Sequence, residues 1–254
     1  MCMKIAIITQ PDNLVIPKNV CLLAEADFVH LAAVLVLDVK GSLMNKRGVF
    51  FRGFGFIQMS KLAFTIVFDK VLKILQGRHE SLRKIARFYN ADFKTVKSLH
   101  EEPMLKYLAA LNLDLIVSYS APIVFKKELL SIPRHGCINL HCSRLPHFAG
   151  LLPSFWVLYF QENIVGATIH YMDDRIDNGG ILAQVEIPLN GAESMYDVIR
   201  ITKESGGKLM LEVLKAFKSG RIKVEENDPE RGSYYTWPTV DEMRNFRKRG
   251  GRLI

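Results

Sequence analysis

Residues 139–150, NLHCSRLPHFAG, bring amide, imidazole, thiol and hydroxyl side chains together in a short stretch. Asn139 and His141 stand two positions apart at the end of an apolar run, and side chains two apart on a strand point to the same face. An amide beside an imidazole can stabilise an oxyanion and move a proton. A carboxylate from the acidic loop DDRIDNGG at 173–180 can fix the tautomer of that imidazole. These groups together indicate acyl transfer to an attacking amine, and the loop offers three carboxylates: Asp173, Asp174 and Asp177.

Two other uses of the same side chains fit the sequence less well. Zinc binding would draw on His141, Cys142, His147 and His170, whose spacing matches no standard zinc signature. Cys142 should face away from His141 because adjacent strand residues point to opposite faces, and nothing near it indicates a lowered thiol pKa. We therefore predict no metal site and no thiol nucleophile, and we expect structural or supporting roles for His147 and His170.

The elements that must position these groups follow the pattern of an α/β protein. Apolar or alternating runs predict strands at 4–9, 29–37, 114–120, 137–141, 166–172 and 181–189. Helical periodicity predicts helices at 101–112, 126–131, 152–162 and 193–218, with a candidate break at Gly206-Gly207. Strands that alternate with helices indicate a mostly parallel twisted sheet flanked by helices. Ligands of such sheets bind beyond the carboxyl ends of the strands, which is where both polar stretches lie.

Length and composition are those of one folded domain with, at most, a small appendage. The chain has 254 residues, of which 49% are hydrophobic, and a formal net charge of +8. Its four cysteines form no CxxC pair, which indicates a reducing, cytoplasmic setting. The start, MCMKIAIITQ, indicates a strand rather than a signal peptide, and QPDNLVIP at 10–17 lacks a Gly-rich phosphate-binding fingerprint. The basic surplus is compatible with nucleic acid, a membrane surface or a small anionic substrate.

Residues 49–75, VFFRGFGFIQMSKLAFTIVFDKVLKIL, are unusually apolar and basic. They contain no run of about 18 uncharged apolar residues that could span a membrane, because charged residues interrupt them at Arg52, Lys61, Asp69, Lys70 and Lys73. Apolar residues recur at helical spacing and predict a helix that covers the sheet through Val67, Val71, Leu72 and Leu75. The alternative is a basic amphipathic element that rests on a membrane surface or a partner.

Residues 133–189 resemble the core of the folate-dependent formyltransferases, the family of the glycinamide ribonucleotide, methionyl-tRNA and nucleotide-sugar formyltransferases. The family pattern Asn-x-His-x-Ser-x-Leu-Pro-x-x-x-Gly is met at 139–150, and Thr-x-His-x-Met-Asp-x-x-x-Asp-x-Gly-x-Ile is met at 168–181. The upstream DLIVSYSAPIVFKKELLSIP at 114–133 is also similar. The resemblance implies a Rossmann-like formyltransferase fold. It implies a catalytic domain over 1–220, most clearly similar at 100–190, and a short basic and aromatic C-terminal extension at 221–254.

By that resemblance the catalytic residues are Asn139, His141 and Asp177, and the family alone selects Asp177 among the three carboxylates. The formyl donor would be 10-formyltetrahydrofolate, and no metal would be needed. Its pterin pocket would be lined by Pro122, Ile123, Val124, Phe125, Met172 and Asp173. The resemblance thus implies transfer of a formyl group to a primary amine.

The acceptor amine is expected to belong to an aminosugar, linked to a nucleotide or a lipid. The chain lacks the Gly-rich loop of glycinamide ribonucleotide members, and only 254 − 189 = 65 residues follow Leu189, whereas tRNA members carry a sizeable C-terminal domain. In the tail at 233–254, Tyr235 and Trp237 could stack on a sugar or base, with His147 as a further substrate contact. The other interpretation of the tail is that its aromatic residues only dock it on the core.

Residues 40–100 depart from the family pattern, which leaves other acceptors open. One alternative is a methionyl-tRNA formyltransferase-like enzyme with a reduced C-terminal region, which would bind nucleic acid in a salt-sensitive way. Another is a formyltetrahydrofolate hydrolase, in which water replaces the amine. The departing segment includes 49–75, through which a cytoplasmic enzyme could contact a membrane.

Overall fold

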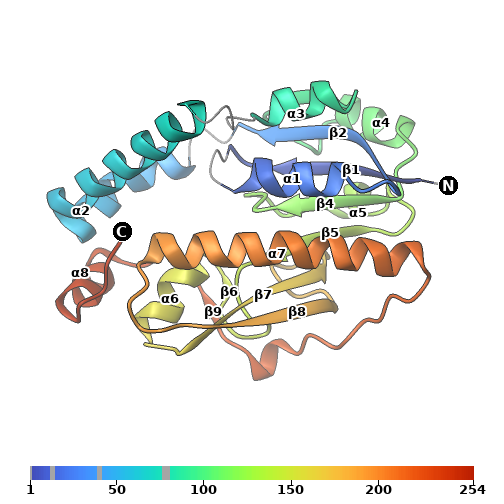
Figure 1. The fold of residues 1–254 in the computed structure, drawn as a ribbon. Coiled ribbons are helices and arrows are strands. Elements are labelled where there is room, and N and C mark those ends of the chain that lie inside the picture. Colours follow the sequence, from blue (N-terminus) through green and yellow to red (C-terminus); the bar gives the residue numbers. More distant parts are fainter. Residues whose placement is uncertain (1, 12–14, 39–41, 76–80) are drawn as a thin grey trace.

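A seven-stranded sheet forms the centre of the computed structural model, which describes residues 2–11, 15–38, 42–75 and 81–254 (Figure 1). The strand order is β3-β2-β1-β4-β5-β7-β8. These strands are β1 (Met3–Thr9), β2 (Val29–Leu37), β3 (Asp92–Val96), β4 (Leu115–Tyr119), β5 (Cys137–His141), β7 (Ile164–Tyr171) and β8 (Ile181–Pro188). The first five in that order pair in parallel, whereas β7 is antiparallel to β5 and β8. The predicted mostly parallel sheet is therefore confirmed.

Helices cover both faces of this sheet, each through an apolar stripe. One face carries α1 (Ile16–Ala24), α3 (Leu82–Phe88) and α7 (Met195–Lys218), and the other carries α4 (Glu102–Ala110) and α5 (Lys127–Leu130). The central strands are apolar on both sides, so that Ile5 and Ile7 reach one layer while Ala6 and Ile8 reach the other. The two layers hold the carboxyl ends of β4 and β5 at a fixed edge.

The strand β3 and the helix α7 differ from the sequence-based expectation. The polar edge strand β3, DFKTV, is missed because it contains no apolar run. The predicted break in α7 is wrong, since the helix continues through both glycines. A Cβ on Gly206 would overlap Leu140, and one on Gly207 would overlap the buried amide of Asn19, whose Nδ2 donates to the carbonyl of Lys203. These glycines let α7 approach β5 and α1 closely.

The helix α2 (Ser42–Leu75) does not cover the sheet. It packs beside α8 (Val240–Lys248) and is interrupted at Gly55, where φ is 75° and ψ is 170°. Val67 and Val71, predicted to face the sheet, are 60% and 45% exposed, so that prediction is wrong. The other helices already occupy both sheet faces and leave no room for it. The side chains of residues 42–47, 70 and 73–75, and with them the predicted roles of Lys70, Lys73 and Leu75, lie outside the described residues.

The C-terminal residues return to the body of the molecule. After the short helix η1 (Pro229–Arg231), β9 (Tyr234–Tyr235) pairs with β6 (Ala149–Gly150), which precedes α6 (Pro153–Tyr159). The α8 residues Met243 and Phe246 are buried in a cluster with Phe54 of α2 and Phe155 of α6. Residues 221–254 thus pack against the loop that follows β5, and the division of the chain at 220 stays a prediction.

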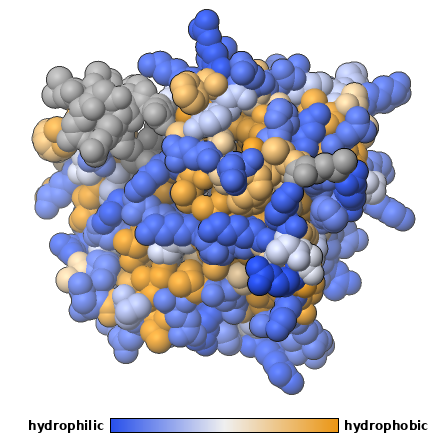
Figure 2. All heavy atoms as spheres, turned by 45° about the vertical axis from the view of Figure 1, so that its right-hand side comes forward, coloured by the Kyte–Doolittle hydropathy of each residue, from blue (hydrophilic) through white to orange (hydrophobic). Residues whose placement is uncertain are grey.

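The surface alternates between polar and apolar side chains. On the face drawn in Figure 2, hydrophilic side chains run between smaller apolar areas. Within the described residues, no helix combines the length and apolar character needed to cross a bilayer.

The close approach of α7 predicts a stability effect. Gly207→Ala should lower the free energy of unfolding by up to about 2 kcal/mol. The new methyl group displaces Asn19 at a cost of about 1–3 kcal/mol, and a gain of about 1 kcal/mol in helix propensity offsets part of that cost. The matched control is Gly48→Ala in α2, where a Cβ meets nothing and stability should stay equal or rise. Urea unfolding of the variants checks this, and a Gly207→Ala protein as stable as Gly48→Ala would refute the packing argument.

Candidate active site

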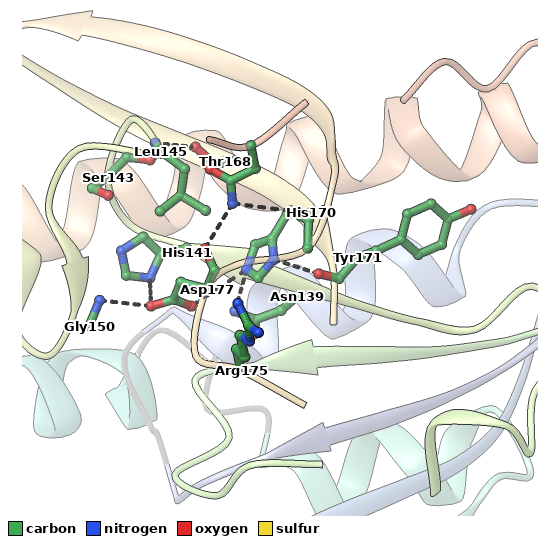
Figure 3. Close-up of polar contacts among 12 residues, drawn as sticks. Asn139, His141, Ser143, Leu145, Gly150, Thr168, His170, Tyr171, Arg175 and Asp177 are labelled. Carbon is green, nitrogen blue, oxygen red and sulfur yellow. Dashed lines mark hydrogen bonds and ion pairs between the residues drawn. The ribbon is translucent and has the colours of Figure 1, made fainter. Parts of the chain in front are cut away.

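The neighbouring strands β5 and β7 bring three polar side chains together, those of Asn139, His141 and His170. Antiparallel pairing sets Asn139 opposite His170 and His141 opposite Thr168. Nδ2 of Asn139 lies 3.2 Å from Nε2 of His170. Because Asn139 and His141 are two residues apart on the strand, both reach the same side, as predicted (Figure 3).

Asp177 links the two imidazoles. In Figure 3 its carboxylate lies between His141 and His170; Oδ2 is 3.3 Å from Nδ1 of His141 and Oδ1 is 3.6 Å from Nε2 of His170. The backbone N–H of Gly150 donates to the same Oδ2 at 2.9 Å. Asp177 adopts a left-handed φ of 52°, which Asp tolerates better than most residues. The amide of Asn227 supports this loop by donating to the carbonyl of Asp177.

Among the three acidic candidates, the structure brings only Asp177 to the histidines. Asp173 instead supports its own loop, where it accepts from the backbone N–H of Arg175 and from Nδ2 of Asn178, each at 2.9 Å. Asp174 is exposed to solvent. The resemblance selects the same carboxylate, and the catalytic role of Asp177 stays a prediction.

His141 has an acceptor at each ring nitrogen. Nε2 lies 2.9 Å from the carbonyl of Phe148, and Nδ1 faces Asp177. An imidazolium ring, which carries a proton on both nitrogens, would be satisfied at both positions. The hydroxyl of Ser143 donates to the carbonyls of His147 and Phe148, which fixes the turn that presents the second acceptor.

His170 is a member of this cluster that the predicted site did not include. Its Nδ1 donates to the carbonyl of Tyr171 at 2.7 Å, so an unprotonated Nε2 is left to accept from Asn139. Burial lowers the pKa of His170 below its ordinary value of 6.5, which favours this neutral form. The neutral ring holds one amide hydrogen of Asn139 and leaves the other for the cavity. The alternation of Thr168, His170 and Met172 in the sequence was the signal for this placement.

A cavity of about 470 Å³ opens beside the cluster. Asn139, His141, His170 and Asp177 form part of its wall. The predicted donor-site residues also line it: Pro122, Ile123, Val124, Phe125, Met172 and Asp173. Its size is within the range of small-molecule sites in proteins.

The predicted substrate contacts differ in whether they line the cavity. Trp237 lines the cavity, whereas His147 and Tyr235 do not. Tyr235 stacks on Trp156 with ring centroids 4.7 Å apart, which docks the tail on α6. His147 is exposed, and substrate roles for His147 and Tyr235 stay predictions. Cys142, the residue after the end of β5, also lines the cavity.

Metal binding would need a cluster of ligating side chains. No group of three or more His, Cys, Asp or Glu side chains there has an arrangement that could hold an ion. The organisation of the site is instead that of hydrogen-bond donors and acceptors around one carboxylate.

Comparison with known proteins places the chain in a family. The sequence model for formyl transferase matches residues 67–214, more than half of the chain, including the three predicted catalytic residues. The chain belongs to the formyl transferase family. It is 30% identical to the methionyl-tRNA formyltransferase of Thermodesulfovibrio yellowstonii over 141 residues. This aligned region covers 56% of this chain and 46% of that protein. The chain spans about half the length of the curated relatives it matches.

Solved structures share the formyl transferase fold over nearly the whole chain. The phosphoribosylglycinamide formyltransferase of Anaplasma phagocytophilum has a TM-score of 0.64 at 16% identity, with 94% of this chain and 100% of that chain covered. An N-formyltransferase of Helicobacter canadensis, in complex with folinic acid and dTDP-3-aminofucose, has a TM-score of 0.61 at 16% identity, with coverages of 96% and 80%. The predicted Rossmann-like formyltransferase fold is thereby confirmed.

The buried neutral histidine predicts a pH dependence of stability. Because the pKa of His170 is lowered in the folded state, the unfolded chain binds more protons below about pH 6.5. The stability that neutral His170 gives the folded protein is therefore complete above about pH 6.5. It is lost as the pH falls through the pKa that His170 has in the folded state. His170→Gln should flatten this acid-side loss, measured by urea unfolding between about pH 5 and 7.5. His147→Gln, at an exposed position, is the control, and equal slopes for the two variants would contradict the assignment.

Proposed function

We propose that the protein is a folate-dependent N-formyltransferase that moves the formyl group of 10-formyltetrahydrofolate to a primary amine on an aminosugar. The observation that carries this proposal is the convergence of Asn139, His141 and Asp177 at the wall of one cavity, in a chain of the formyl transferase family. The amide, imidazole and carboxylate are the groups that acyl transfer to an amine needs.

The chemistry divides among these three side chains. The lone pair of a neutral amine attacks the formyl carbon, and the carbonyl oxygen becomes an oxyanion. The free amide hydrogen of Asn139 and the ring of His141 stabilise that charge; at comparable sites one such donor accounts for about 10²–10³-fold in rate. To reach the oxyanion, Nε2 of His141 exchanges its present acceptor, the carbonyl of Phe148. Asp177 keeps the ring oriented meanwhile.

Proton movement completes the balance of the reaction. The attacking nitrogen loses a proton as its bond to carbon forms, and the folate nitrogen gains one as its bond to the formyl carbon breaks. His141 and Asp177 lie where they can relay that proton, directly or through water. The products are the formylated amine and tetrahydrofolate. Holding both substrates in one cavity removes much of the entropic barrier.

The wall of the cavity fits the proposed donor. The segment Pro122–Phe125 and Met172 supply apolar surface to a flat heterocycle. Asp173, a further lining residue, is held in place by its two hydrogen bonds. No metal is required for this reaction as we propose it.

An aminosugar acceptor is supported by the remaining lining residues. Trp237 offers an aromatic face, and Arg175 and Lys203 contribute cationic side chains suited to a phosphate-linked sugar. Structures with the same fold include a sugar N-formyltransferase of a Shewanella species and the dTDP-3-aminofucose complex described above. We also propose a cytoplasmic location, where the four cysteines, none of which forms a disulfide, would stay reduced, and peripheral membrane contact through residues 49–75.

A methionyl-tRNA acceptor is the second candidate. The curated relatives with about 30% identity are methionyl-tRNA formyltransferases, and the basic charge of +8 is compatible with nucleic acid. If this candidate is right, tRNA binding should weaken steeply with salt.

The catalytic assignment is tested by two neighbouring carboxylates. Asp177→Asn should reduce turnover by about 10²–10⁴-fold with the fold intact, because His141 loses its charged partner. Asp174→Asn, an exposed position in the same loop, should keep its activity. Tetrahydrofolate release and circular dichroism are measured for both variants. Near-normal turnover by Asp177→Asn would remove this residue from the mechanism.

The acceptor is tested by an amine panel. The protein is incubated with 10-formyltetrahydrofolate and, in separate reactions, amino-sugar nucleotides, aminoacylated initiator tRNA or no amine. We expect tetrahydrofolate release to depend on an amino-sugar nucleotide. Turnover with tRNA alone would favour the second candidate. Release of formate at the same rate without any amine would indicate a hydrolase.

A further inference from the structure

The second half of α2 presents its apolar face outward. Six large apolar residues with spacings of one, three, four and seven lie along that face and are 45–70% exposed: Phe56, Ile57, Phe64, Val67, Phe68 and Val71. We call them the outer stripe. The opposite side of the helix faces the body, where Met59 and Leu62 pack and Asp69 accepts from the Tyr196 hydroxyl at 2.7 Å. An amphipathic helix of a globular protein normally has the reverse orientation.

This orientation is built into the fold by the first half of α2. Phe54 is fully buried against Phe155 and Phe246, with ring centroids 6.4 and 6.2 Å away. Arg247 of α8 donates to the carbonyl of Gly53, just before the interruption at Gly55. These anchors hold the interruption at Gly55 beside α8, and from there the second half runs back toward the side where the chain continues to α3 (Figure 1). The outer stripe is thus held outward by packing on the other side.

The charge of α2 favours an anionic occupant. Residues 42–75 contain six basic residues and one acidic residue, and the acidic one, Asp69, is bonded to Tyr196. The exposed Lys61 flanks the outer stripe, where a long cationic side chain can reach headgroups while its methylenes cover apolar surface. Two copies of such a face would bring like charges together, whereas an anionic bilayer attracts them.

We infer that the outer stripe of α2 docks on an anionic membrane surface, with the helix lying in the interface plane. Apolar side chains would enter the boundary between headgroups and acyl chains while the basic residues meet lipid phosphates. This inference does not depend on the proposed activity.

The same helix contacts the candidate active site. Phe50, in the first half of α2, lies edge-on to Trp237 at 5.8 Å between ring centroids, and Trp237 lines the cavity. A docked helix would therefore place the cavity beside the membrane surface. Resting on the proposed function, this arrangement adds amines presented at a membrane, such as a lipid-linked aminosugar, to the acceptors that a docked enzyme would reach.

Vesicle flotation of the full chain tests the docking. The protein should float with vesicles of phosphatidylcholine and phosphatidylglycerol, less with phosphatidylcholine alone, and less at high salt, because exposed charges are screened. The double variant Phe64→Ser, Phe68→Ser should bind anionic vesicles about tenfold more weakly or worse. The matched control is Phe88→Ser on α3, which removes a phenylalanine that is 78% exposed and should bind normally.

The other outcomes decide against the inference. Absence of flotation with anionic vesicles, or equal flotation of the double variant, would overturn it. Concentration-dependent association in solution that the double variant abolishes, without vesicle binding, would assign the outer stripe to a second copy of the chain. Turnover with a soluble acceptor should be the same in the double variant, so failure of docking is separable from failure of the proposed activity.

Discussion

The carboxylate of Asp177 joins segments that are distant in the sequence. His141 comes from the end of β5, His170 from β7, and the N–H of Gly150 from the turn that follows NLHC, and all three meet its two oxygens. An anion that is only 10% exposed needs hydrogen-bond donors, because burying an unpaired charge is costly, and the N–H of Gly150 and the ring of His141 are placed to supply them. The same contacts fix the positions of the groups that would act on a substrate.

The antiparallel return of β7 makes this meeting possible. A parallel strand would place its carboxyl end beside that of β5, but β7 runs the other way and places His170 directly across from Asn139. The loop after β7 then has to turn back, and it does so through the left-handed Asp177. Local backbone strain of this kind is found often at functional sites.

The helix α2 shows how a tertiary contact can invert a sequence pattern. Its apolar residues have the spacing of a core helix, yet the anchoring of Phe54 and Gly53 against α6 and α8 turns the outer stripe to solvent. The matching family model begins at residue 67, within α2.

The sequence by itself determined the strands β1, β2, β4 and β5, because they are buried on both sides and appear as apolar runs. It also determined that Asn139 and His141 share a face, since that follows from the two-residue repeat of a strand. Only the tertiary structure decided that Asp177 rather than Asp173 or Asp174 reaches His141, and that His170 orients Asn139. Those choices depend on strand register and on the path of a loop, which join residues about thirty positions apart through contacts that no local pattern encodes.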